Sequence, residues 1–345
     1  MTWLTWRQFR ASAVAGLLAL AAFAVMLSVT GPGLAHLYDT SGLAGCHTGC
    51  DGLANVFLRQ LQAAGTYPTL YEISILIVLV APGVIGIFWG APLIAREIEA
   101  GTLRLAWTQS ISRARWLAVK VALTGLAAMA ATELLSLMQA WWARPIGQAA
   151  ALATDQSSLL AMGRLDPLVF VTHGITPLGY AAFAFALGVT AGVIIRRAVP
   201  AMAVTLAVFA VVQFAMPNWI RPHLIPPVRL TRAFNPEALT GLLQNSNGQM
   251  TVADAVKIPG AWVISNQTVT PSGQVFTGPA PAVCNRDAGM QACADALGKL
   301  HLRQLAFYQP ASRFWALQGI EAGIFVVFAL FFAGFCFWWI RRRVS

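Results

Sequence analysis

Long apolar stretches without charged residues are the main feature of the hydrophobic pattern of this 345-residue chain. A helix that crosses a membrane needs about 20 mostly apolar residues. Six stretches meet that requirement, and the pattern therefore predicts six transmembrane helices. They cover residues 11–30, 71–95, 117–142, 168–195, 198–216 and 314–340.

The first apolar stretch also resembles a secretory signal, because Arg7 and Arg10 precede it and the small residues Gly33 and Ala35 follow it. The apolar core of a signal peptide is about 7–15 residues long, which is shorter than this stretch. We therefore interpret it as a retained membrane anchor, with cleavage as the alternative.

The positions of Lys and Arg predict the orientation, since short loops rich in these residues stay in the cytoplasm. The loops expected outside, 31–70 and 143–167, contain only Arg59, Arg144 and Arg164. Both termini are therefore predicted to be cytoplasmic. The segments expected inside contain Arg7, Arg10, Arg96, Arg104, Arg113, Arg115, Lys120, Arg196, Arg197, Arg341, Arg342 and Arg343.

Composition supports a membrane protein and argues against several other classes. Hydrophobic residues make up 57% of the chain and charged residues 10%, against about 25% charged in soluble domains. A soluble enzyme, a nucleic-acid binder and a disordered protein are all poor interpretations. The net charge of +10 is explained by the excess of Lys and Arg expected in the cytoplasmic segments of a membrane protein. No nucleic-acid partner is therefore expected, and the surface that the chain contacts is lipid.

The predicted fold class is an all-α integral membrane protein with three parts. Residues 1–216 contain the first five spans, and residues 314–345 contain the sixth span and a basic cytoplasmic tail. Residues 217–313, rich in Pro, Gly, Asn and Gln, are expected to form an irregular extracellular cap.

Four of the five cysteines fall in the segments expected outside, where an oxidising environment favours disulfides. Local pairing joins Cys46 to Cys50 and Cys284 to Cys293, and crossed pairing stays open. A metal site at 46–50 is the alternative for the first pair, but no second pair of ligands is evident there.

Residues 96–113 form the most informative polar stretch. Gly101 is expected to end the helix of the second span, and Thr102 to cap a short cytoplasmic helix at about 100–110. A charged helix held between two spans is suited to docking a partner or transmitting force, and an ordinary positive-inside loop is the alternative. The residues assigned to this role are Arg96, Glu97, Glu99, Gly101, Thr102, Arg104, Trp107, Ser112 and Arg113.

The pairs Arg96-Glu97, Gly101-Thr102 and Ser112-Arg113, followed by Lys120, resemble the signature of type-2 ABC exporter permeases. The number of spans, the Arg196-Arg197 turn and the long segment before the last span resemble the architecture of the G subfamily in particular, here of an actinobacterial type. The long first outer loop departs from that subfamily.

The resemblance implies that the helix at 100–110 is a coupling helix that sits in a cleft of an ABC ATP-binding subunit. It also implies a second permease copy, and a disulfide in the last outer loop, which favours Cys284–Cys293. The only Gly-Lys pair, Gly298-Lys299, lacks a glycine-rich loop. This chain is therefore expected to have no cofactor and no enzymatic activity, with ATP and Mg²⁺ bound by the partner subunit.

Ionisable residues inside spans are costly and often functional. Glu133, His173 and Glu321 all fall in the outer half of their predicted spans, so we expect them to meet around a cavity or gate. The alternative is hydrogen bonding between helices, with Glu133 protonated and Glu321 near enough to the interface to extend into it.

Glycines and prolines at 82–92 interrupt the second span, and interrupted helices often border a pathway. The resemblance implies that the second and fifth spans line a central cavity. Phe209, Gln213 and Met216 form one face of the fifth span and are the other pathway candidates, with simple packing as the alternative.

These observations together predict the permease subunit of an ATP-driven exporter in a bacterial plasma membrane. The sparsely charged cavity favours an amphipathic or hydrophobic compound, such as a drug, antibiotic or lipid. A non-transporting sensor or immunity subunit that uses the same ATPase contact is the alternative.

Overall fold

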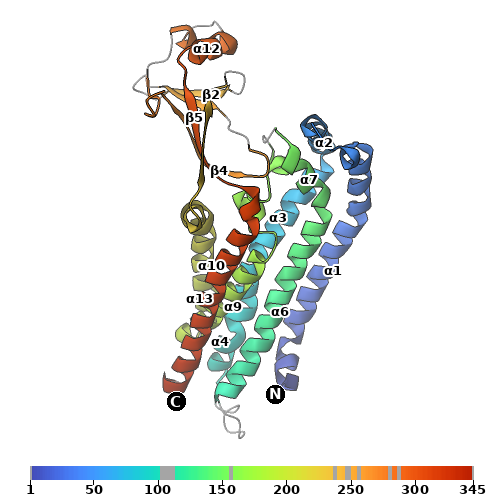
Figure 1. The fold of residues 1–345 in the computed structure, drawn as a ribbon. Coiled ribbons are helices and arrows are strands. Elements are labelled where there is room, and N and C mark those ends of the chain that lie inside the picture. Colours follow the sequence, from blue (N-terminus) through green and yellow to red (C-terminus); the bar gives the residue numbers. More distant parts are fainter. Residues whose placement is uncertain are drawn as a thin grey trace. The chain divides into compact units, whose positions relative to one another are not determined.

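The computed structural model describes residues 2–101, 113–154, 158–235, 239–244, 250–254, 258–278, 282–285 and 289–343. Its chain forms two compact units, drawn in Figure 1. The helical unit consists of Met1–Leu224 and Phe314–Ser345, and the smaller unit consists of Ile225–Arg313.

Within the described residues, six helical stretches are long and apolar enough to cross a membrane, which confirms the predicted number. They cover Arg10–Thr40, Thr66–Glu99, Arg115–Trp142, Thr176–Ile195, Ala198–Leu224 and Ala311–Arg342. Their main helices are α1 (Thr2–Thr40), α3 (Thr66–Ile85), α4 (Pro92–Glu99), α6 (Arg113–Trp142), α9 (Thr176–Ile195), α10 (Ala198–Ala215) and α13 (Phe314–Arg343).

Within the helical unit, the start of α1 and the end of α13 lie at one end, which we call the terminal end (Figure 1). The opposite end, which we call the cap end, carries two short helices, α2 (Asp51–Ala63) and α7 (Arg144–Leu152).

Three spans have one end that lies far from its predicted position. The first continues to Thr40 through Pro32. The fourth begins at Thr176, because Gly174 (φ 67°) turns the chain after the separate short helix α8 (Pro167–Phe170). The fifth continues to Leu224 through the π-helical turn η4 (Met216–Ile220) and α11 (Arg221–Leu224). The predicted ends at 30, 168 and 216 were therefore wrong.

The predicted interruption of the second span is confirmed. A π-helical turn, η2 (Gly86–Gly90), separates α3 from α4. Such turns insert an extra residue into a helix, and they occur frequently at functional sites.

Helix α9 lies at the centre of the helical unit and contacts α3, α4, α6, α10 and α13. All its residues from Phe183 to Val193 are buried. Small residues let it approach the second span closely: a Cβ added at Gly188 would lie 2.3 Å from the Gly86 carbonyl oxygen, and one at Gly192 would lie 2.4 Å from that of Ala91. Membrane helices commonly associate through such small residues, because backbones then touch directly.

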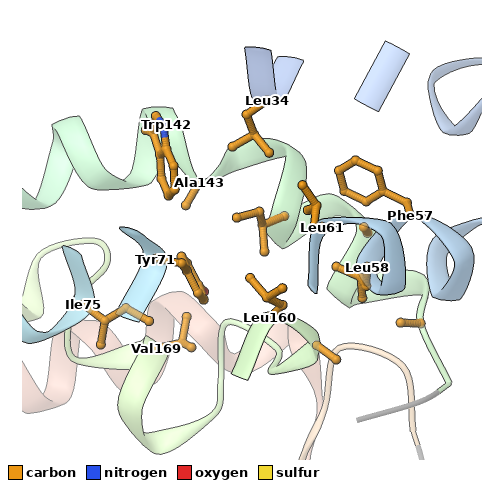
Figure 2. Close-up of a cluster of buried hydrophobic side chains, with 14 of the residues drawn as sticks. Leu34, Phe57, Leu58, Leu61, Tyr71, Ile75, Trp142, Ala143, Leu160 and Val169 are labelled. Carbon is orange, nitrogen blue, oxygen red and sulfur yellow. The ribbon is translucent and has the colours of Figure 1, made fainter. Parts of the chain in front are cut away.

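The first and third inter-span loops form a packed cap rather than open loops. Leu34 of α1, Phe57 and Leu61 of α2, and Leu160 of the 3-10 turn η3 (Leu159–Ala161) belong to one buried cluster with Tyr71 of α3 (Figure 2). The structure pairs Cys46 with Cys50 just before α2, close to the short turn η1 (Leu43–Gly45).

The smaller unit contains strands, so the all-α prediction and the irregular cap were wrong for this segment. Its antiparallel sheet has the order β1-β5-β4, and a separate hairpin joins β2 to β3. The strands are β1 (Val228–Ala233), β2 (Leu239–Gln244), β3 (Met250–Asp254), β4 (Trp262–Val269) and β5 (Arg303–Gln309), with turns η6 (Ala282–Asn285) and η7 (Ala311–Arg313) and helix α12 (Gly289–Gly298).

Half-buried strands explain why the sheet was missed. In β1 the side chains alternate between partly buried and exposed, as in Val228-Arg229-Leu230. A strand of this length gives a weak sequence signal beside 20-residue apolar runs. The disulfide between Cys284 and Cys293 contributes to the unit's small core, together with Leu297.

Substituting Gly188 with Ala should destabilise the helical unit, because the new Cβ meets the backbone of the second span. Overpacking of this kind costs about 1–3 kcal/mol or more. The melting temperature of the detergent-solubilised protein measures the effect.

Gly323→Ala on α13 is the matched control, since no described atom lies within 4 Å of its added Cβ. Equal melting temperatures for the two variants would contradict the close backbone contact.

Candidate functional site

A groove of about 560 Å³ runs between the second and fifth spans of the helical unit. Its walls come from α3, η2, α10 and η4, with α8 at the cap end. All lining residues are apolar except Gln213 and Asn218. Ligand sites in proteins are commonly concave and apolar with a few polar groups, and this groove has that character.

Two π-helical turns border the groove, because Ile87 of η2 and Pro217 of η4 both line it. An irregular turn in a membrane helix leaves its backbone less regularly bonded and is tolerated beside a cavity. The π-helical turn η2 in the second span and the π-helical turn η4 in the fifth span therefore lie at the same groove.

Two of the three pathway residues predicted on the fifth span line this groove. Phe209 packs edge-on against Tyr180, with ring centroids 6.3 Å apart, and a Cβ added at Gly83 would lie 2.7 Å from its ring. Among the described residues, the Oε1 atom of Gln213 is buried and has no hydrogen-bond partner. Met216 is buried and is not among the lining residues.

Glu133 and His173 do not line the groove either. His173 lies in the turn before α9 rather than within a span, and its Nδ1 is 2.9 Å from the carbonyl oxygen of Val169. Glu133 is half-buried on α6. The structure shows no contact of either residue with Glu321 among those it describes, and Glu321 has a different partner.

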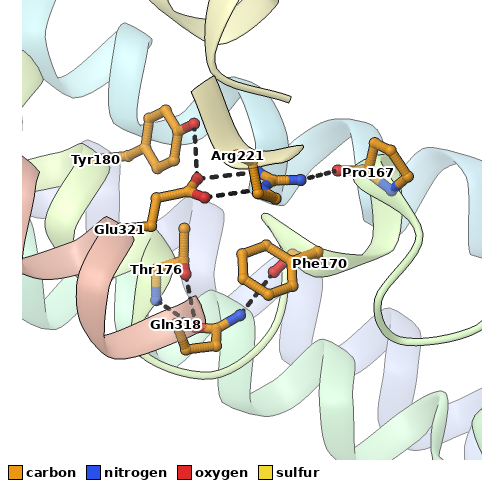
Figure 3. Close-up of polar contacts among 7 residues, drawn as sticks. All are labelled: Pro167, Phe170, Thr176, Tyr180, Arg221, Gln318 and Glu321. Carbon is orange, nitrogen blue, oxygen red and sulfur yellow. Dashed lines mark hydrogen bonds and ion pairs between the residues drawn. The ribbon is translucent and has the colours of Figure 1, made fainter. Parts of the chain in front are cut away.

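That partner is Arg221, the first residue of α11 (Figure 3). Its Nε donates to Oε2 of Glu321 at 2.7 Å and its Nη2 to Oε1 at 2.9 Å, with both side chains fully buried. The Tyr180 hydroxyl also donates to Oε1, at 3.1 Å. A bidentate pair of this geometry is among the strongest charge-assisted contacts. Glu321 therefore forms hydrogen bonds between helices, as the alternative interpretation of this residue supposed.

The guanidinium of Arg221 makes two further contacts at the cap end. Its Nη1 donates to the carbonyl oxygen of Pro167 at 3.3 Å, and its centre lies 4.3 Å from the ring centroid of Phe170. Both partners belong to α8, so Arg221 links α11 to α8 as well as to α13.

The side-chain amide of Gln318 on α13 connects the same group of helices by hydrogen bonds to α9 and α8. Oε1 of Gln318 accepts from the backbone N–H and the hydroxyl of Thr176, at 2.8 and 2.6 Å. Its Nε2 donates to the carbonyl oxygen of Phe170 at 3.0 Å. We refer to Arg221, Glu321, Tyr180 and Gln318 as the cap-end cluster.

Asp166 lies next to this cluster and caps α8 by accepting from the Leu168 N–H at 3.2 Å. Burial raises the pKa of this carboxyl above its usual range, while the Leu168 N–H and the Arg221 charge oppose the shift.

Sequence reasoning missed Arg221, because the fifth span was ended at 216 and Arg221 was assigned to the loop. The available signal was a pair of opposite charges: Arg221 lies just after one apolar run and Glu321 lies inside another. In lipid, such charges are expected to pair.

The predicted coupling residues lie at the terminal end. Glu97 and Lys120 form an ion pair between α4 and α6, and Oε1 of Glu99 accepts from the backbone N–H of Ala198 at 3.2 Å. Ala198 is the first residue of α10, so the acidic end of α4 contacts the starts of both α6 and α10.

Gly101 has a φ of 66° and follows the end of α4, as predicted for a helix break. Arg96 and Glu99 are exposed, and Arg113 is the first residue of α6. Thr102, Arg104, Trp107 and Ser112 lie outside the described residues.

Among the described residues, the structure shows no cluster of three His, Cys, Asp or Glu side chains suited to a metal ion. The six spans and the groove between them define a multi-pass integral membrane protein. The chain belongs to the ABC-2 membrane transporter related family, whose model matches residues 17–221, more than half of its length. Membrane subunits of this family are not themselves ATPases, and the family implies an ATP-binding partner. No curated protein and no solved structure matches the chain.

Substituting Glu321 with Gln should destabilise the protein strongly, since Arg221 would remain buried without its counter-charge. Removing one partner of a buried pair costs about 3–5 kcal/mol. Thermal unfolding of the purified protein measures the loss, with Glu72→Gln, an exposed carboxylate of α3, as the control.

The double variant Arg221→Met/Glu321→Leu should recover most of that stability, because apolar replacements leave no unpaired charge. A Glu321→Gln protein as stable as the Glu72→Gln control would show that the buried pair contributes little.

Proposed function

We propose that this chain is the permease subunit of an ATP-driven ABC exporter that moves an amphipathic or hydrophobic compound across a bacterial plasma membrane. The chain crosses the membrane six times with both termini in the cytoplasm, and the 225–313 unit is extracellular. A second permease copy and an ABC ATP-binding subunit, which holds ATP and Mg²⁺, complete the transporter.

The groove is the observation that carries this proposal. It is apolar, it lies between two spans with π-helical turns, and it contains an amide oxygen at Gln213 without a partner among the described residues. An apolar body of a substrate would replace lipid or water there. A hydroxyl or amine on the substrate would donate to Gln213, because a buried acceptor is costly to leave unpaired.

Contacts at the terminal end support coupling. The ATP-binding subunit would move the segment at 100–110, through Thr102, Arg104, Trp107 and Ser112. Glu97 would transmit the movement to α6 through Lys120, and Glu99 would transmit it to α10 through Ala198. Helix α10 forms one wall of the groove, so the same movement would change the groove between inward-facing and outward-facing states.

Co-purification from native membranes with a tag on this chain tests the proposal. We expect a stoichiometric partner that hydrolyses ATP, and export activity after reconstitution. Arg104→Glu should abolish both the partner's recovery and export, while membrane insertion stays normal. Arg59→Glu, the same reversal on the exposed face of α2, should change neither.

Recovery of the chain without an ATPase would contradict the transporter assignment. Recovery with an ATPase but without export of any tested compound would favour the sensor or immunity subunit.

Substituting Gln213 with Leu should raise the KM for exported compounds that carry a hydroxyl or amine, and leave compounds without donors unaffected. One hydrogen bond contributes about 0.5–1.5 kcal/mol, which corresponds to a change of roughly 2–10-fold. Efflux of amphipathic dyes with and without donors measures the effect. Val211→Leu, at an exposed position outside the groove lining, is the control, and an equal shift for both dye classes would remove Gln213 from substrate contact.

A further inference from the structure

The cap end of the groove is formed by two short segments that come from distant parts of the chain. Pro167, Leu168 and Val171 form one wall, and Pro217 and Asn218 form the other. The first wall belongs to α8 and the residue after it, and the second belongs to η4. The separation of these walls determines how wide the groove is at this end.

Arg221 links the two walls. It lies one helical turn beyond Pro217, and its Nη1 donates to the carbonyl oxygen of Pro167 on the opposite wall at 3.3 Å. Glu321 holds the same guanidinium from α13 through two shorter bonds, of 2.7 and 2.9 Å (Figure 3). Arg221 is thus held by two short bonds on one side, and on the α8 side by one longer hydrogen bond and by the contact with the Phe170 ring.

The segment on that side is short and separate from the spans. Helix α8 contains only four residues, and Gly174 with its positive φ separates it from α9. A buried ion pair adds little net stability compared with apolar packing, because burying its charges is costly. Its main physical effect is to fix geometry, and the geometry fixed here is the distance between the walls.

We propose that Arg221, positioned by Glu321, is a latch that keeps the cap end of the groove closed. The latch opens when Arg221 releases the Pro167 carbonyl oxygen and α8 moves away from η4, while Arg221 stays paired with Glu321. Both are positioning residues, and neither contacts the transported compound. As a step in transport the latch depends on the proposed exporter function, but access to the groove is measurable without transport.

Thiol labelling of the groove tests the latch. The reporter is Gln213→Cys in a Cys336→Ser background, since the other four cysteines are paired in disulfides. A membrane-impermeant maleimide is applied to the full-length protein in right-side-out membranes, without ATP or substrate. The variant is Arg221→Met/Glu321→Leu, which removes the link to Pro167 without leaving a buried charge unpaired.

The double variant should be labelled about tenfold faster or more, because losing a hydrogen bond to a charged group shifts a two-state equilibrium by at least that factor. Thr190→Val is the matched control. It removes the bond between α9 and α13 from the Thr190 hydroxyl to the carbonyl oxygen of Phe332, at 3.4 Å and far along α9 from Tyr180, and should leave the labelling rate unchanged.

If the double variant does not fold, Arg221→Lys replaces it, because Lys keeps the charge opposite Glu321 but lacks the fork that reaches a second acceptor. It should also accelerate labelling. Labelling at the parent rate in a folded variant would overturn the latch. Faster labelling of a protein that neither binds an ATPase nor exports dyes would support the latch and reject the exporter function. Active export with labelling at the parent rate would support the exporter function and reject the latch.

Discussion

Direct contact between the backbone of α9 and that of the second span is the interaction on which the helical unit depends. Gly188 and Gly192 bring α9 against the carbonyl oxygens of Gly86 and Ala91, closer than any larger residue allows. Lipid tails compete with apolar side chains for any surface, so helices in a membrane gain most from close packing of this kind. The same approach places η2 between α9 and α10, and it thereby positions one wall of the groove.

Polar contacts at the two ends of the bundle then determine how the remaining helices sit around α9. At the cap end, Arg221 and Glu321 join α11, α13 and α8. At the terminal end, Glu97 and Glu99 join α4 to α6 and α10. The groove lies along helices that both sets of contacts reach, so a displacement at either end alters its walls.

The sequence correctly predicted the number of spans, the break in the second span and two residues that line the groove. Long apolar runs and helical spacing are local patterns, so they can be recognised without knowing the fold. Span ends were less predictable: α8 and α11 are short, and their positions depend on contacts such as Arg221 with Pro167, between residues far apart in the chain. The strands of the 225–313 unit were missed because Val228–Ala233 is too short to give a distinct pattern. The docking role of the helix expected at about 100–110 stays a prediction.

Along the sequence, Arg221 comes just before the smaller unit and Glu321 shortly after it, near the points where the chain leaves and re-enters the helical unit at Leu224 and Phe314. The pair therefore closes the ends of this long insertion by bonds inside the helical unit. The entropic cost of closing such a segment grows only slowly with its length. Evolution is thus free to shorten, enlarge or exchange the insertion without redesigning the bundle, and protein engineers have the same freedom.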